Sequence, residues 1–290
     1  MGIVTRLKRA TKEALGLKQW PRPEAPQPSS YEDQLYAALV RHGDVCFDVG
    51  ANYGEVALFL AQTVGESGLV VAFEPVWPMY TELCRFIQRD TTQKAPILTV
   101  PMGMSDAVKD ATIHVPNGDF TMGSMADPAA WAGAQPGAKL DTHRVRFTTL
   151  DAYLATTGFR PPTFLKIDVE GAELFVPRGG EKLLTSGTPP LMLIEVFAPW
   201  EKAFGYQPWE PLSWLMERGY RFLFVCPTGL VEYEPTASQP FPPEYEMGYN
   251  VVAYQPAAHA DRIAAARHLR PAPQTKLLPM TPPPRPNHIA

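Results

Sequence analysis

Residues 46–57 read CFDVGANYGEVA, and they set the class of fold. An apolar run ends at Asp48, and two glycines, Gly50 and Gly54, then bracket a polar turn that leads into a helical pattern. A strand, a glycine turn and a helix in that order are typical of the first unit of an α/β domain. Open sheets of this type bind ligands beyond the carboxyl ends of their strands, so the residues that follow each strand are candidates for a site.

Strand and helix patterns alternate along the rest of the chain as far as residue 255. The strands are continuously apolar, which indicates a mainly parallel seven-stranded sheet with helices on both faces. The predicted strands are residues 44–49, 69–74, 95–106, 164–169, 191–197, 220–226 and 249–255, with an added strand at 111–116. The predicted helices are residues 54–65, 75–90, 151–158, 171–187 and 209–219.

Composition sets the two ends apart from the middle. The chain has 32 prolines in 290 residues, about twice the usual share. Residues 1–20 and 255–290 each carry five basic and one acidic group, so the net charge of −4 conceals an acidic centre, which argues against nucleic acid as a partner. The predicted organisation is a basic amphipathic segment (1–20), a proline-rich linker (21–30), a folded domain (31–256), and a helical stub with a disordered proline-rich tail (257–290).

The basic segment has apolar residues at helical spacing, so it either packs on the domain or lies on an anionic membrane surface. No stretch is long and apolar enough for a signal peptide or a spanning helix. The three cysteines, Cys46, Cys84 and Cys226, are far apart and form no zinc or disulfide pattern. We therefore expect a cytoplasmic protein.

Acidic and polar residues follow the first three strands. Asp48 suits a ligand with an ammonium group, and Asn52 replaces the middle glycine of the fingerprint that dinucleotide-dependent oxidoreductases carry. Glu74 ends the second strand, where an acid can accept bonds from ribose hydroxyls. Ser105 and Asp106 follow the third, where an aspartate can accept a bond from an adenine amino group. A single acid at a strand end is more often a helix cap than a ligand, but together these residues favour S-adenosylmethionine over a nicotinamide cofactor.

The fourth segment, FLKIDVEGAELFVPRGGEKLL (164–184), followed by LMLIEV (191–196), resembles the FkbM family of S-adenosylmethionine-dependent methyltransferases. DVGANYG (48–54), AFEP (72–75), MSD (104–106), TTLDAYL (148–154) and NVVAY (250–254) add to the resemblance. It implies a Rossmann-like methyltransferase fold with an antiparallel last strand, and methyl transfer to an oxygen on a sugar or another natural product. It covers roughly residues 40–255 and leaves both ends unexplained.

Within this resemblance, the expected cofactor-binding residues are Asp48, Gly50, Asn52, Gly54, Glu74, Ser105, Asp106 and Asp168. The expected catalytic residues are Lys166, Asp168, Glu170 and Glu195. We expect Asp168 beside the transferred methyl group, and Glu170 or Glu195 at the acceptor or its proton. The alternative for Glu170 and Glu173 is that they are acids in the first turn of a helix, where the helix dipole favours negative charge. Asp168 and Glu195 could instead hold a divalent ion, but a metal is disfavoured because no third ligand is evident.

Two long loops are expected to shape a pocket for a small-molecule or glycan acceptor. Residues 117–144 contain Phe120, Met122, Met125 and Trp131, and residues 232–249 contain Tyr233, Phe241, Tyr245 and Tyr249. These rings either stack on the acceptor or only anchor the loops. His114 and His143 are candidate bases, with a solvated surface role as the favoured interpretation. A non-catalytic cofactor-binding or glycan-binding protein is the alternative function, and the methylated atom, the general base and the oligomeric state stay open.

Overall fold

The structure is a computed structural model that describes residues 31–90, 93–126, 139–196, 198–243, 245 and 249–271. Its centre is an eight-stranded sheet in the order β10-β9-β11-β8-β7-β1-β2-β3. Its strands are β1 (Val45–Val49), β2 (Leu69–Phe73), β3 (Ile97–Val100), β7 (Phe164–Ile167), β8 (Leu191–Val196), β9 (Arg221–Cys226), β10 (Gly229–Glu232) and β11 (Tyr249–Tyr254). The predicted basic segment and linker, and the tail beyond residue 271, lie outside the described residues.

The α/β fold class and the mainly parallel sheet are confirmed. Strands β3, β2, β1, β7 and β8 are parallel neighbours, and the last strand, β11, runs antiparallel to both β8 and β9. The predicted number of seven strands is wrong by one, because β10 pairs antiparallel with β9 and extends that edge of the sheet. The short turn between Cys226 and Gly229 makes this hairpin, and sequence patterning did not reveal it.

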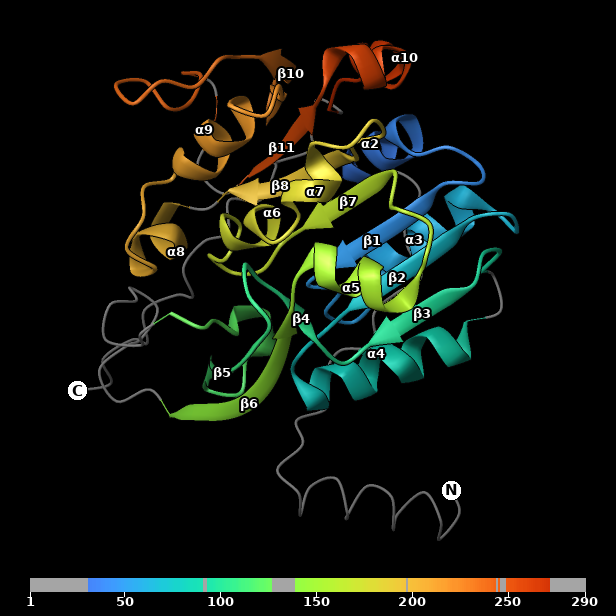
Figure 1. The fold of residues 1–290 in the computed structure, drawn as a ribbon, viewed down its shortest axis with the longest axis vertical. Helices are drawn as coiled ribbons and strands as arrows, with labels where there is room; N and C mark the ends of the chain where they lie inside the picture. The colour runs from blue at the N-terminus through green and yellow to red at the C-terminus, as the bar shows by residue number, and fades with distance from the viewer. Residues whose placement is uncertain are drawn as a thin grey trace, which may run out of the picture.

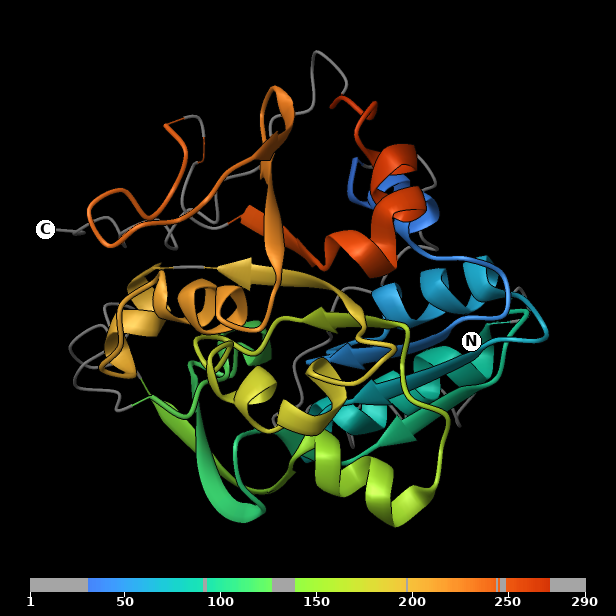
Figure 2. The ribbon, with the colours of Figure 1, turned by 45° about the horizontal axis from the view of Figure 1, so that its top comes forward.

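Helices cover both faces of the sheet (Figure 1). One face packs against α2 (Tyr31–Leu39), α3 (Glu55–Val64), α4 (Trp77–Arg89) and α10 (Pro256–Ala266). The other face packs against α5 (Leu150–Thr157), α6 (Phe175–Arg178), α7 (Glu181–Leu184) and α9 (Glu210–Met216), while α8 (Ala198–Ala203) follows β8. Figure 2 shows α10 beside α2, so the first and last described helices share one layer.

A second, three-stranded sheet lies next to the carboxyl end of the large one (Figure 1). It has the order β4-β6-β5 and consists of β4 (Gly103–Met104), β5 (Lys109–Pro116) and β6 (Leu140–Thr148), with the short 3-10 helix η1 (Phe120–Met122) after β5. The predicted strand at 95–106 is therefore two strands in two sheets. Pro101 has no N–H to continue the ladder after β3, so the chain leaves the large sheet there.

The single helix predicted at 171–187 is wrong, because the segment forms two short helices, α6 and α7. The break falls at Gly179 and Gly180. A Cβ atom on Gly179 would lie 2.1 Å from the carbonyl oxygen of Ser105, so only glycine lets these backbones approach. This contact draws the end of α6 against the segment that follows β4.

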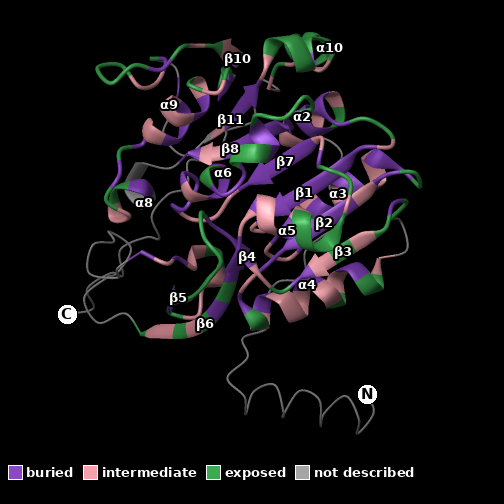
Figure 3. Ribbon diagram, in the orientation of Figure 1, coloured by how far each residue is buried: buried purple, intermediate pink, exposed green. Residues whose placement is uncertain are grey.

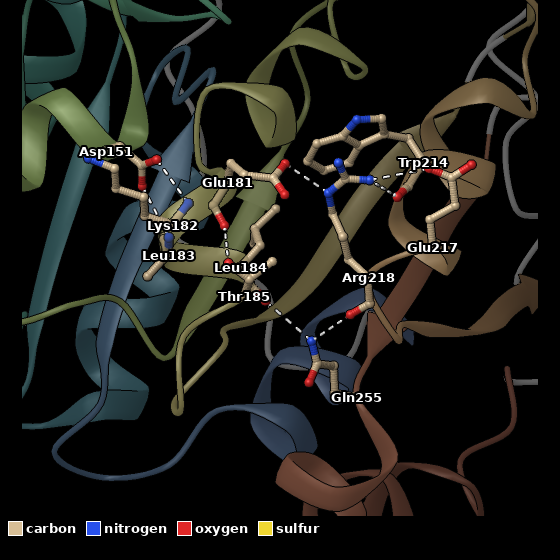
Figure 4. Close-up of polar contacts among 10 residues, drawn as sticks. All are labelled: Asp151, Glu181, Lys182, Leu183, Leu184, Thr185, Trp214, Glu217, Arg218 and Gln255. Carbon is tan, nitrogen blue, oxygen red and sulfur yellow. Dashed lines mark hydrogen bonds and ion pairs between the residues drawn. The ribbon is translucent and has the colours of Figure 1, made fainter.

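Burial follows this layering: the central strands are buried, and solvent reaches the outer sides of the helices (Figure 3). A cluster of polar contacts connects several of these elements (Figure 4). The guanidinium of Arg218 donates to Glu181 at 2.8 Å and stacks 3.4 Å from the Trp214 ring centroid. Asp151 of α5 accepts from the backbone N–H groups of Lys182 and Leu183, which caps α7. This cluster therefore fixes α5, α7 and α9 relative to one another.

Candidate functional site

A cleft opens between the carboxyl ends of β1, β2 and β7 and the inner face of the small sheet. It holds about 690 Å³ of space, including its open mouth. Five of the predicted site residues line it: Gly50, Asn52, Glu74, Asp168 and Glu170. The remaining lining residues are Val49, Pro75, Val76, Gly103, Met104, Ile113, Phe120, Thr121, Gly123, Met125, Phe147, Val169 and Ala172.

The glycine turn after β1 forms the floor of the cleft. Gly50 has φ 85°, and a Cβ atom there would lie 1.8 Å from the carbonyl oxygen of Asp168. Asn52 also has a positive φ, 49°, which asparagine tolerates better than most residues. The turn thus leads into α3 with bare backbone facing the cleft. Gly54 does not line the cleft. A Cβ atom there would lie 2.4 Å from the Leu83 side chain, so the packing of α3 against Leu83 favours glycine at this position.

Glu74 joins the end of β2 to this turn. Its Oε2 accepts from the backbone N–H of Asn52 at 3.1 Å, and its Oε1 accepts from that of Val76 at 2.8 Å. Burial raises the pKa of Glu74 to about 7, against the effect of these two N–H groups. Each oxygen keeps a further acceptor position, so a carboxylate held in place by backbone lines the cleft.

Asp48 lies below the floor and does not line the cleft. Its side chain is fully buried, and neither oxygen has a hydrogen-bond partner of normal geometry among the described residues, although the N–H of Ala57 helps to stabilise its charge. Burial raises the pKa of Asp48 to about 6, and Lys166 opposes the rise. Its direct contact with a ligand stays a prediction.

Lys166, Asp168 and Glu195 form one polar group at the ends of β7 and β8. The Lys166 ammonium donates to Asp168 Oδ2 at 2.6 Å, and the Lys166 side chain is only 7% exposed against 31% for Asp168. Burial opposes ionisation of Asp168, but Lys166 and a hydrogen bond from Glu195 lower its pKa. Burial, then the charge of Asp168, raise the pKa of Glu195 well above its usual value. Asp168 and Glu195 thus share a hydrogen bond that favours the ionised form of Asp168.

The turn from Asp168 to Gly171 holds Glu170 in an unusual conformation. Glu170 has φ 53°, which side-chain-bearing residues rarely adopt. Its carbonyl accepts from the Ser124 hydroxyl at 2.7 Å, and the carbonyl of Gly171 accepts from the Tyr206 hydroxyl at 2.6 Å. Glu173 Oε1 accepts from the N–H groups of Val169 and Gly171, at 3.0 and 3.2 Å. The turn is thus anchored from three sides.

Glu170 and Glu173 make different contacts. Glu173 is 2% exposed and precedes α6, and it braces the turn through the N–H groups before it rather than lying in the first turn of the helix. Glu170 instead lines the cleft, and its Oε2 has no hydrogen-bond partner among the described residues. Burial, followed by the charges of Asp168 and Glu173, raises the pKa of Glu170 well above its usual value. A carboxyl group with a raised pKa in a cleft suits proton transfer.

Ser105 and Asp106 lie outside the lining of the cleft. Ser105 is fully buried and donates to Asp106 Oδ1 at 3.1 Å, which also accepts from Lys109 at 3.2 Å. Their neighbours Gly103 and Met104 line the cleft instead. The predicted role of Ser105 and Asp106 at an adenine ring stays a prediction.

The two long loops have different roles. Phe120 and Met125 line the cleft, whereas residues 127–138, including Trp131, lie outside the described residues. The rings of the second loop pack on one another: the centroid of Tyr245 lies 5.0 Å from that of Phe224 and 5.1 Å from that of Phe241. These rings anchor their loop on the sheet, so the described ones do not line the cleft.

Sequence reasoning missed the contribution of α2. Its Glu32 accepts from the Tyr36 hydroxyl at 2.8 Å and from the Asn250 side chain at 3.5 Å. Lys166 lowers and Asp168 raises the pKa of Glu32, although burial is the larger effect and the net shift is upward. Glu32 thus belongs to the electrostatic surroundings of the site. No motif marks a helix that docks beside strands so distant in sequence.

The two candidate histidines lie away from the cleft. His114 and His143 are both half-buried on the small sheet and do not line the cleft, and burial lowers the pKa of His143. Within the described ranges, no cluster of three or more His, Cys, Asp or Glu residues could hold a metal ion. No described helix is long and apolar enough to cross a membrane.

Comparison with known proteins identifies the family. The family model for the methyltransferase FkbM domain matches residues 48–222, which run from the glycine turn through the Asp168–Glu170 turn to β9. This chain belongs to the FkbM methyltransferase domain family. The FkbM chain is also 29% identical over 181 residues to "AMB antimetabolite synthetase AmbE" of Pseudomonas aeruginosa, covering 51% of this chain and 8% of that protein. It therefore spans only a small part of that much longer relative.

Two of the solved structures similar to the FkbM chain carry the word methyltransferase in their descriptions. The methyltransferase FkbM from Methylobacillus flagellatus is 14% identical, with a TM-score of 0.44 over 76% of this chain and 48% of that one. The O-methyltransferase from Bacillus cereus, in complex with SAH, is 12% identical, with a TM-score of 0.42 over 87% of this chain and 90% of that one. These scores are low, so the fold rests on the strand order of the chain itself.

Proposed function

We propose that this FkbM domain is an S-adenosylmethionine-dependent O-methyltransferase that acts on a hydroxyl group of a sugar or of a glycosylated natural product. The observation that carries the proposal is the single cleft that joins Gly50, Glu74, Asp168 and Glu170. These residues come from three strand ends, yet they line one space with bare backbone at one side and a carboxyl group of raised pKa at the other.

The residues of the cleft fit the methyl donor. Gly50 leaves its floor free of a side chain, and Glu74 presents carboxylate oxygens that two backbone N–H groups already hold in position. Such a carboxylate suits a ribose diol, which needs an acceptor for each hydroxyl. The donor supplies an activated methyl group when bound, so the chain's task is to align it and to exclude water.

The other polar residues of the site would act on the acceptor, each in a different role. Lys166 keeps Asp168 ionised, and Asp168 can therefore accept a hydrogen bond beside the reacting centre. Glu170 lies at the side of the small sheet and receives the proton that the acceptor hydroxyl loses. Glu195 shares a hydrogen bond with Asp168 and helps to fix its orientation. We place the protein in the cytoplasm because Cys46, Cys84 and Cys226 are all free thiols.

The proposal is tested by calorimetric titration of S-adenosylhomocysteine, followed by transfer of a tritiated methyl group to an extract of small molecules and glycans. We expect micromolar binding and labelled product. Glu170→Gln should lower the transfer rate by about a hundredfold or more, because a positioned base contributes roughly that much, and should leave binding nearly unchanged. Binding without any transfer would instead support a non-catalytic protein, and no binding would refute the proposed cofactor.

A further inference from the structure

The Ser124 hydroxyl connects the loop of the small sheet to the turn that carries Glu170. It donates to the Glu170 carbonyl at 2.7 Å, and its oxygen accepts from the backbone N–H of Ala126 at 3.2 Å. Because the oxygen already accepts from Ala126, the hydroxyl proton is directed to Glu170. Ser124 is 1% exposed, so water has little access to either bond.

The backbone of Ser124 is itself fixed on the small sheet. Its N–H donates to the His114 carbonyl at 3.1 Å, and its carbonyl accepts from the His114 N–H at 2.8 Å. Its neighbours, Gly123 and Met125, line the cleft on the side of the small sheet, and Glu170 lines the same cleft. One buried side chain therefore joins the wall proposed to contact the acceptor to the carboxyl group proposed to take its proton.

The bond from Ser124 acts on the peptide unit between Glu170 and Gly171. The carbonyl of this unit accepts from Ser124, and its N–H donates to Glu173 Oε1 at 3.2 Å, so the unit is held at both ends. Glu170 has φ 53° and Gly171 has φ 98°. A side-chain-bearing residue keeps such a conformation only where its surroundings impose it, and a glycine next to it lets a released peptide unit rotate. Loss of the Ser124 bond would therefore free the direction of the Glu170 side chain.

We propose that Ser124 is a positioning residue for methyl transfer: its hydroxyl holds the Glu170 peptide unit so that the Glu170 carboxyl faces the acceptor. This inference rests on the proposed methyl transfer and on Glu170 as the group that receives the proton. Ser124 does not line the cleft, so it acts through Glu170. Tyr206 bonds to the next carbonyl of the turn, that of Gly171, and so does not replace the bond from Ser124.

The position of Glu170 has a second observable consequence. Burial is the main cause of the raised pKa of Glu170, and four charged side chains also act on it: Asp168, Glu173, Lys166 and Asp119. A turn that relaxes gives the carboxyl group more contact with water, which lowers its pKa toward the ordinary value. A proton acceptor that moves therefore changes both the rate of transfer and the pH at which the rate falls.

The test uses the full chain with Ser124→Ala, which removes the hydroxyl, and Ser124→Thr, which keeps it. The donor is tritiated S-adenosylmethionine, and the acceptor is the fraction of an extract of small molecules and glycans that the wild type labels best. We expect Ser124→Ala to lower kcat on the order of tenfold, because the proton acceptor is misplaced, and to shift the acid limb of kcat/KM to lower pH. Affinity for S-adenosylhomocysteine should stay within about twofold, and Ser124→Thr should restore most of the rate.

A measurement without substrate accompanies these rates. Carboxyl ¹³C signals of labelled glutamate are followed during a pH titration, and Glu170→Gln identifies the Glu170 signal. We expect a lower pKa for Glu170 in Ser124→Ala than in the wild type. Thr149→Ala is the matched control, because it removes another hydroxyl, one that accepts from the Ala152 N–H at 3.0 Å and caps α5. It should lower stability and change neither kcat nor the Glu170 signal.

Three outcomes would overturn the inference. If Ser124→Ala keeps the kcat and the Glu170 titration of the wild type, Ser124 does not position Glu170, and the proposed methyl transfer stands. If kcat and affinity for S-adenosylhomocysteine fall together, as after a general loss of structure, the role of Ser124 is only structural. Binding of S-adenosylhomocysteine by the wild type without label in any product would overturn the proposed transfer and this inference with it.

Discussion

Glu74→Ala removes the carboxylate that connects the end of β2 to the glycine turn. In the intact protein its two oxygens accept from the N–H groups of Asn52 and Val76, at 3.1 and 2.8 Å, and each keeps room for a second donor. The proposed ribose would use those two acceptor positions. The variant therefore tests both the cofactor and the residue that holds it.

The expected loss follows from the number of bonds. Two hydrogen bonds to a charged group, at about 1.5 kcal/mol each, give about 3 kcal/mol, or more than a hundredfold in affinity. Glu74→Gln is the matched variant, since its amide has a similar shape but only one acceptor oxygen. We expect it to lose roughly half of this free energy.

The assay is calorimetric titration of S-adenosylhomocysteine at pH 8 and pH 6. Burial raises the pKa of Glu74 to about 7, so the free carboxyl is mainly ionised at the higher pH and mainly protonated at the lower one. Binding that needs the ionised form should weaken as the pH falls in the wild type, and should be less sensitive to pH in Glu74→Ala. An Ala variant that binds within about threefold of the wild type would refute the assigned role.

Three further predictions concern stability. Glu170→Gly should raise the free energy of unfolding by about 1 kcal/mol, because glycine adopts φ 53° without strain; urea denaturation measures it. Arg262→Ala should lower that free energy by about 3 kcal/mol, because it leaves the Asp44 carboxylate, only 7% exposed, without the guanidinium that donates to both of its oxygens. Burial lowers the pKa of His259, so stability that is complete above about pH 6.5 should fall as the pH drops below it, and less so in His259→Ala.

Each of these has an internal control. Glu210→Gly, at the first residue of α9 where φ is helical, should not stabilise the protein. Asp261→Ala removes an exposed ion pair with Arg41 at 4.0 Å and should change stability by less than about 1 kcal/mol. Buried carboxyls such as Asp48 have raised pKa values and favour the folded state at low pH, so only the difference between wild type and His259→Ala reports the histidine. Equal pH profiles for the two would contradict the reasoning.

The sequence was sufficient for seven of the eight strands of the large sheet, because these strands are short apolar runs. Glu74, Asp168 and Glu170 could be named because parallel strands bring their carboxyl ends to one edge, and all three line the cleft. Strand ends do not show which way a side chain points. Asp48 is in register with Lys166 on the neighbouring strand, and its side chain is buried below the floor of the cleft.

Contacts between segments far apart in the chain were beyond sequence reasoning. The hydroxyl groups of Ser124 and Tyr206 reach the Glu170 turn from loops with no motif of their own. The division of the 171–187 helix depends on a backbone approach to Ser105 that Gly179 permits, and glycine alone does not predict its neighbour. His259 lies in an alanine-rich helix with no motif, yet its ring bonds to the carbonyl of Pro189 across the fold.

The pairing of α2 with α10 has a consequence for how the chain folds. Arg262 bonds to Asp44 across 218 positions of sequence, and Tyr31 bonds to Leu269 across 238. Closing a loop of that length is slow compared with forming local contacts. During synthesis on the ribosome, Leu35 and Leu39 on the apolar side of α2 cannot be fully buried until Ile263 of α10 has been synthesised. We infer that the nascent domain needs protection from aggregation at this helix for most of its translation.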